Sequence, residues 1–129
     1  MKLTKAQRQD LRERFGGRCA YCGHELGSRW HADHVEAVIR KLHYQKGKGF
    51  VQTGEMYNPA RDAMDNMMPS CASCNIDKSV FDLETWRDVI RKKVEVLNRY
   101  HPAYRHAVRF GLVQETGASV VFHFERMQT

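Results

Sequence analysis

The chain has 129 residues, with 21 lysines and arginines against 15 aspartates and glutamates and a formal net charge of +6. This length predicts one small domain, because single cores typically serve about 100 to 150 residues. No stretch approaches the roughly 18 consecutive apolar residues of a membrane-spanning helix, and the first ten residues lack the apolar segment of a secretion signal. We therefore expect a soluble, cytoplasmic protein with no membrane association.

The positive charge is concentrated in two segments. Residues 1–18 and residues 40–50 each carry a net charge of +4, so the rest of the chain is mildly acidic. A basic surface of this kind favours an anionic partner, with nucleic acid ahead of membrane because no basic amphipathic helix dominates the chain. Composition leaves one alternative open, a basic surface that only keeps the protein in solution.

The first half of the chain is predicted to begin with a helix. Thr4 and Gln7 fit a capping box at its start, and Gly16–Gly17 ends it. A strand-like run follows from Trp30 to Ile39. Residues 43–62 carry glycines and a proline without a clean period, so this segment is predicted to be a loop, long enough to be functional.

The second half is predicted to be mainly helical. Apolar residues recur at helical spacing from Asp82 to Arg99, which indicates an amphipathic helix with Trp86 in the core. Residues 103–110 are weakly helical. From Ser119 to Glu125, apolar and polar residues alternate, which predicts a strand. The edge of that strand offers a route to a homodimer, and a monomer is the other expectation.

All four cysteines fall into two C-x2-C pairs, Cys19 with Cys22 and Cys71 with Cys74, separated by 48 residues. Two such turns can complete a closed tetrahedral site of four thiolates, which is typical of structural zinc. Disulfides or a redox pair are the alternatives, but the chain lacks a secretion signal and a thioredoxin-like pattern. We expect one structural Zn2+ that compensates for the small core by joining distant parts of the chain.

Three polar residues beside the cysteine pairs suggest metal-dependent hydrolysis. Asp33 and His34 belong to the strand-like run, and Asn75 directly follows the last cysteine. Neighbouring side chains of a strand point to opposite faces, so Asp33 and His34 share a site only if the strand ends or bulges there. Carboxylate and amide oxygens suit Mg2+, and an imidazole can accept a proton from water near neutral pH. The set predicts metal-assisted cleavage of a phosphodiester.

With these residues the chain resembles the HNH endonucleases, whose fold is the ββα-metal fold. Many relatives have His where this chain has Asn75, so the chain matches a His-Asn-Asn variant. The resemblance implies a single α+β domain over residues 1–129, with its core at about 15–100 and a C-terminal helix and strand extension at 101–129. The matching residues run in the family's order over about residues 15–80: Cys19, Cys22, Asp33, His34, Asn66, Pro69, Cys71, Cys74, Asn75 and Lys78.

The resemblance also implies a role for each catalytic residue. His34 is expected to be the general base that activates water. Asp33 and Asn75 are expected to hold one catalytic Mg2+ or Mn2+, and Asn66, within the second strand, to orient the loop that follows the histidine. In-line attack on phosphorus would then leave a 5′ phosphate.

The 31 residues between His34 and Asn66 exceed what a plain hairpin of this family needs. The extra length coincides with the basic segment 40–50, which suggests an insertion that grips DNA; a solvated loop without specific contacts is the alternative. Asp62 and Asp65 lie close to Asn66 and offer further carboxylates. The expected DNA contacts are Arg40, Lys41, Lys46, Lys48 and Lys78.

The sequence therefore predicts a metal-dependent endonuclease that nicks or cuts double-stranded DNA, similar to the homing-type nucleases of phages and mobile elements. One alternative is a non-catalytic DNA-binding module held together by zinc. Another is a zinc protein whose partner is not a nucleic acid.

Overall fold

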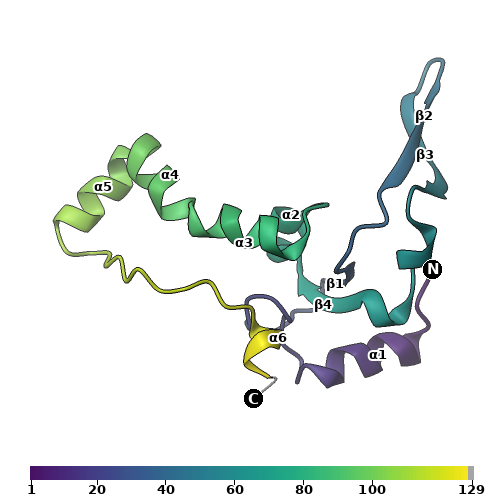
Figure 1. Ribbon diagram of the computed structural model, residues 1–129, viewed down its shortest axis with the longest axis horizontal. Coiled ribbons are helices and arrows are strands. Elements are labelled where there is room, and N and C mark those ends of the chain that lie inside the picture. The colour runs from purple at the N-terminus through teal and green to yellow at the C-terminus, as the bar shows by residue number, and fades with distance from the viewer. Residues whose placement is uncertain (128–129) are drawn as a thin grey trace. The chain divides into compact units, whose positions relative to one another are not determined.

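The computed structural model describes residues 1–127 and is a small α+β fold with two antiparallel two-stranded sheets and several helices (Figure 1). The chain divides into two compact units. The first contains Met1–Leu83 and the segment from Phe122 onward, and the second is Glu84–Val121. The boundary expected at residue 101 falls inside the second unit. None of the helices within residues 1–127 has the length and apolar character needed to cross a membrane.

Helix α1 spans Lys5–Arg14 and confirms the helix expected at the N-terminus. The hydroxyl of Thr4 accepts a hydrogen bond from the backbone of Gln7, and the side chain of Gln7 accepts one from the backbone of Thr4. This reciprocal pair is the predicted capping box, which satisfies two backbone donors at the helix start. Leu11 on this helix is fully buried, so α1 packs on the core of the first unit.

The central element of the first unit is a two-stranded antiparallel ribbon. Strand β1 (Trp30–His34) pairs with β4 (Met67–Cys71), and the register places Trp30 opposite Cys71 and His34 opposite Met67. Helix α2 (Ala72–Lys78) follows β4 without a linker, and the Sγ of Cys71 caps it by accepting the backbone N–H of Cys74. Strand β1 ends at His34, which is shorter than the expected run to Ile39.

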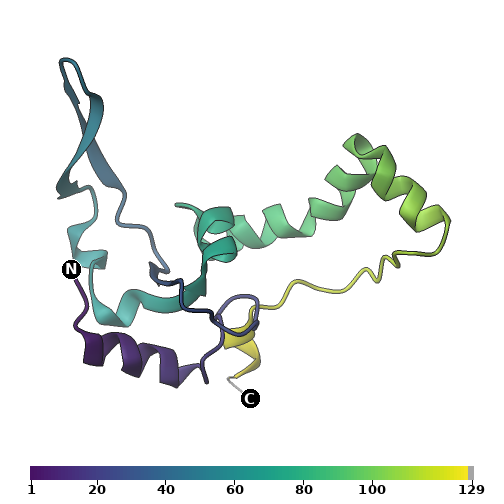
Figure 2. The same cartoon turned by 180° about the vertical axis from the view of Figure 1, so that it is seen from behind.

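The segment expected to be a loop contains a second hairpin. Strand β2 (Arg40–Gln45) pairs with β3 (Gly49–Met56) around the turn Lys46–Gly47–Lys48, and the two extend from the β1–β4 ribbon (Figure 2). The prediction was wrong because Leu42 and Tyr44 alternate with polar residues over too short a run to stand out among the neighbouring glycines. Most side chains of the hairpin are exposed, so burial adds no further strand signal. Two short 3-10 helices, Pro59–Arg61 and Met64–Asn66, then lead back to β4.

The second unit is helical. The single helix expected at 82–99 is two helices, α3 (Leu83–Arg91) and α4 (Lys93–Tyr100), and α5 (Pro102–Arg109) confirms the weak helix expected after them. Trp86 is buried, as the periodicity indicated. Glu115 accepts hydrogen bonds from the side chains of Asn98 and Tyr104, which ties the segment after α5 to α4 and α5.

The strand expected at Ser119–Glu125 does not form. Its second half is a short helix, α6 (His123–Arg126), which belongs to the first unit. The backbone N–H groups of His123 and Phe124 donate to the carbonyls of Tyr21 and Ala20, and the Phe124 ring lies 6.4 Å from that of Tyr21. These donors are therefore engaged within the chain, and the strand edge on which the expected dimer depended is missing.

A buried ion pair connects β1 with α2. The ammonium of Lys78, which has no exposed surface, lies 3.1 Å from Oδ2 of Asp33 and donates at 2.9 Å to the carbonyl of His34. The hydroxyl of Tyr21 donates to the same Oδ2 at 2.6 Å. Burial and the Asp33 charge raise the pKa of Tyr21, so its hydroxyl stays protonated and remains a donor. Both charged groups of this pair are therefore compensated inside the core.

We predict that Lys78→Met destabilises the protein by about 3 kcal/mol or more, because it leaves the Asp33 carboxylate buried without a counter-ion. The double variant Lys78→Met with Asp33→Asn removes both charges and should recover much of this loss. Lys46→Met, at an exposed position, is the control. Denaturant unfolding of the wild type, of Lys78→Met and Asp33→Asn singly, and of the double variant measures the coupling, and strictly additive effects would contradict a specific pair.

Candidate functional site

The four cysteines form one cluster although 48 residues separate the two pairs. Their Sγ atoms all lie within 4.8 Å of one another, and those of Cys22 and Cys71 are 3.9 Å apart. Four thiolates at about 2.3 Å from a tetrahedral Zn2+ would be separated by about 3.8 Å. No disulfide joins them. The cluster can therefore hold one metal ion, and its dimensions are consistent with zinc.

The first pair is shaped by a tight turn. The backbone N–H of Cys19 donates to the carbonyl of His24, and that of Gly23 donates back to the carbonyl of Cys19. Gly23 has φ +79°, and a Cβ there would lie 3.2 Å from the Nδ1 of His123. Glycine is therefore favoured by the backbone conformation, and a side chain there would also force the His123 ring of α6 to shift.

The second pair is positioned by the end of β4 and the first turn of α2. The turn of the first pair is joined to β4 directly, because the backbone N–H of Ala20 donates to the carbonyl of Pro69 at 2.8 Å. Hydrogen bonding from Cys74 lowers the pKa of Cys19 to about 4, and the same bond raises the pKa of Cys74. A divalent cation would supply the positive charge that allows the remaining thiols to ionise together.

His34, at the end of β1, is held by a carboxylate. Its Nε2 lies 2.9 Å from Oδ1 of Asp62. Hydrogen bonds from the Met1 ammonium and from His34 lower the pKa of Asp62, so this carboxylate is ionised and can only accept. Nε2 must therefore carry the proton in this contact, and in the neutral ring Nδ1 keeps its lone pair.

Asn66 holds the chain that follows His34. It ends the 3-10 helix immediately before β4, not within the strand as expected. Its Oδ1 accepts the backbone N–H of Glu36 at 3.0 Å, and its Nδ2 donates to the carbonyls of Glu36 and Arg61 at 2.8 Å each. The amide side chain thus pairs with Glu36 as a strand backbone would and fixes the path of the loop after His34.

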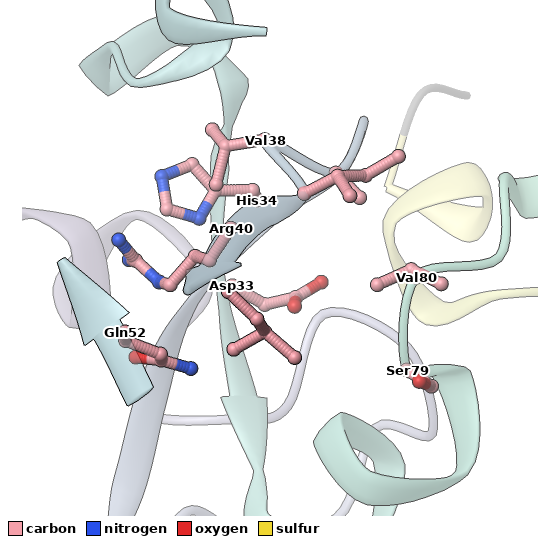
Figure 3. A pocket seen from close by; sticks show the side chains of 10 residues that line it. Asp33, His34, Val38, Arg40, Gln52, Ser79 and Val80 are labelled. Carbon is pink, nitrogen blue, oxygen red and sulfur yellow. The ribbon is translucent and has the colours of Figure 1, made fainter. Parts of the chain in front are cut away.

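Two pockets meet at His34. The first, of about 380 Å3, is lined by Asp33 and His34 together with residues of the hairpin, among them Arg40 and Gln52 (Figure 3). The second, of about 340 Å3, has no carboxylate among its lining residues. Its charged or titratable lining side chains are Lys2, Arg8, His31, His34 and Arg40. His34 therefore lies beside a strongly basic surface, which suits an approaching phosphate.

Asp33 and His34 both line the first pocket. Neighbouring residues of a continuous strand would point to opposite faces, but β1 ends at His34, so the two side chains can share one site. Both contacts described for the Asp33 carboxylate, with Tyr21 and with Lys78, involve Oδ2, so Oδ1 is the oxygen available for a cation. Asn75 lies on α2 three residues before Lys78, and residues at this spacing are neighbours on a helix surface. Asn75 therefore shares a helix face with the residue that contacts Asp33, but it does not line the pocket that Asp33 and His34 share.

The basic residues expected to bind DNA fall into two groups. Four of them belong to the β2–β3 hairpin: Arg40, Lys41, Lys46 and Lys48. Lys78 does not fit the prediction, because its side chain is fully buried and paired with Asp33. A buried ammonium cannot meet a DNA phosphate, so the structure gives Lys78 a positioning role instead.

Two side chains of the site were not assigned by sequence reasoning. Asp62 is noticeable in the sequence only as a spare carboxylate near Asn66, and its contact with His34 depends on the 3-10 helices that fold the segment back. Tyr21 lies between the two cysteines of the first pair. Its hydrogen bond to Asp33 connects the cysteine cluster with the end of β1.

Comparisons with known proteins give no relative on which a function could be based. No family model matches the chain, and neither a curated protein nor a solved structure is significantly similar to it. A function for this protein is therefore inferred from its own residues and contacts.

Proposed function

We propose that this protein is a metal-dependent DNA endonuclease of the HNH type, with His34 as its general base. The observation that carries the proposal is the environment of His34. The ring is fixed by Asp62 at the end of β1, beside a pocket whose charged or titratable lining residues are all basic. A positioned base next to a phosphate-attracting surface is what phosphodiester hydrolysis requires.

In this proposal the Nδ1 atom of His34 takes a proton from the attacking water. Asp62 keeps Nε2 protonated and stabilises the imidazolium that forms, since its carboxylate remains ionised. Asn66 fixes the loop behind the histidine and so limits the movement of the ring. Arg40 lines both pockets beside His34 and is the side chain suited to hold a non-bridging phosphate oxygen.

The catalytic cation would be held by Asp33 through Oδ1 and by the amide oxygen of Asn75. Both are hard oxygen donors, which fit Mg2+ or Mn2+ with water and phosphate oxygens completing the coordination. When bound, such an ion stabilises negative charge on the phosphate and on the leaving oxygen. Lys78 and Tyr21 hold the other oxygen of Asp33 and thereby orient the carboxylate.

The metal of the four-cysteine cluster is proposed to be zinc with a structural role. Four thiolates leave no open position for water, which distinguishes a structural from a catalytic site. Bound zinc would join the turn at Cys19–Cys22 to the end of β4 and so hold β1 in place through Tyr21. The zinc is therefore expected to support the catalytic residues without taking part in the reaction.

Removing one cysteine should remove the metal and unfold the first unit. Structural zinc contributes on the order of 10 kcal/mol, which is comparable with the whole stability of a small domain. We expect Cys74→Ser to lose about one equivalent of zinc and its cooperative thermal transition. Ser73→Ala, exposed in the same turn, is the matched control and should keep both. A Cys74→Ser protein with full zinc content and an unchanged transition would contradict the assignment.

Zinc-loaded protein should convert supercoiled plasmid into nicked or linear DNA when Mg2+ or Mn2+ is added, and not without it. His34→Ala should lower the cleavage rate by about 10^2-fold to 10^4-fold, because it removes the general base. Zinc content, thermal stability and DNA affinity should remain unchanged. His101→Ala, an exposed histidine of the second unit, is the control. Equal cleavage by the wild type and His34→Ala would remove His34 from the reaction, and no cleavage by wild type would favour a DNA-binding module.

Asp62→Asn should reduce kcat with little effect on KM. The amide can donate to Nε2 and so favours the opposite ring tautomer, in which Nδ1 carries the proton and cannot accept one. The tautomer is read from the 15N chemical shifts of His34, which report on the ring even if turnover is absent. Asp65→Asn, at an exposed position three residues away, is the control. Unchanged kcat together with unchanged 15N shifts would show that Asp62 does not position the base.

A further inference from the structure

The β2–β3 hairpin exposes an apolar face. Tyr44 pairs with Phe50 and Leu42 with Gln52 in the register, so these four side chains lie on one side of the hairpin and are called here the hairpin face. Leu42, Tyr44 and Phe50 are 57%, 69% and 72% exposed. The Tyr44 and Phe50 rings pack edge to face at 5.7 Å, so they form one continuous aromatic surface. Such a surface is costly in water and indicates an occupant.

The charge around the hairpin face is almost entirely positive. Three cations accompany it, Arg40 at its base and Lys46 and Lys48 in its turn. The one acidic residue of the hairpin, Glu55, lies 3.7 Å from His43 and 4.0 Å from Lys41, whose side chains alternate to the opposite side. An apolar face bordered by cations is complementary to a polyanion with apolar groups between its charges, and not to a lipid core or to a second basic copy of the hairpin.

The hairpin face is continuous with the candidate active site. Leu42 and Gln52 line the same pocket of about 380 Å3 as Asp33 and His34 (Figure 3). Hydrogen bonds from the backbones of Tyr57 and Asn58 to the carbonyls of Ile39 and Val38 fix the base of the hairpin beside that pocket. One end of the hairpin face therefore borders the pocket that contains His34.

We propose that the hairpin enters a groove of duplex DNA next to the phosphate that is cleaved, with Tyr44 and Phe50 against the bases and Lys46 and Lys48 on the backbone. A two-stranded antiparallel ribbon fits the width of the major groove, where apolar side chains can contact thymine methyl groups. Lys46 and Lys48 lie in the turn on either side of Gly47, where they would meet the phosphate backbone that borders the groove. This inference rests on the proposed function, which makes DNA the ligand, and it adds that the β2–β3 hairpin binds that DNA.

The experiment separates the two kinds of contact by their salt dependence. Binding of a 30-base-pair duplex by the His34→Ala protein, which does not cut, is measured by fluorescence anisotropy at several salt concentrations. Lys46→Ala with Lys48→Ala should reduce the slope of log affinity against log salt by about 2, one for each lost phosphate contact. Tyr44→Ser with Phe50→Ser should weaken binding about tenfold at every salt concentration and leave the slope unchanged.

The matched control is Tyr100→Ser with Phe110→Ser, which removes one exposed tyrosine and one exposed phenylalanine from the second unit. The proposal is overturned if this control weakens binding as much as the hairpin pair does, or if the hairpin pair binds like its parent. It is also overturned if the hairpin pair converts a dimer to a monomer without affecting DNA binding. DNA binding with the expected pattern but without plasmid cleavage by wild type would reject the nuclease and keep this inference.

A second measurement does not depend on removing the aromatic side chains. Phe50→p-benzoylphenylalanine keeps an aromatic group and forms a covalent bond to nearby atoms on illumination. Cross-linking to the duplex from position 50, and none from the same change at Phe110, is the expected result. Equal cross-linking from both positions, or none from position 50, would overturn the proposal even if the serine variants fail to fold.

Discussion

The convergence of four cysteine sulfur atoms is the constraint on which the first unit depends. It brings the turn after α1 to the junction of β4 and α2, across 48 residues of intervening chain. Other contacts extend from the same place, since α6 donates its first backbone N–H groups to Tyr21 and Ala20. A metal ion at this cluster would thus stabilise a unit whose few fully buried apolar side chains form only a small core.

A chain of contacts leads from this cluster to the candidate active site. Tyr21 follows Cys19 by two residues and donates to Asp33, which pairs with Lys78 at the end of α2. Lys78 in turn donates to the carbonyl of His34. The buried ion pair between Asp33 and Lys78 therefore fixes the end of β1. The side chain of His34, the proposed base, lines the basic pocket at this end. These three side chains thus connect the cysteine cluster with the proposed site.

The local elements were predicted where the sequence carries a complete local signal. Helix α1 has its capping box, and α3 and α4 have an apolar period of helical spacing, although the single predicted helix is broken at Lys92. The hairpin was missed because both its faces are exposed and its apolar alternation is limited to Leu42, Tyr44 and Phe50, which is a weak strand signal among glycines. The expected final strand was wrong because Phe122 and Phe124 pack on Tyr21, and this contact overrides the alternation around them.

The sequence by itself determined the four cysteines that cluster and the small set of polar residues around the proposed reaction, because the C-x2-C spacing and the Asp33–His34 pair are local properties of the chain. Only the tertiary structure decided how these residues are used. It buries Lys78 against Asp33, where sequence suggested a surface cation, and it brings Asp62 to His34 across 28 positions. Burial and long-range contact depend on how distant segments pack, and no short stretch of sequence contains that information.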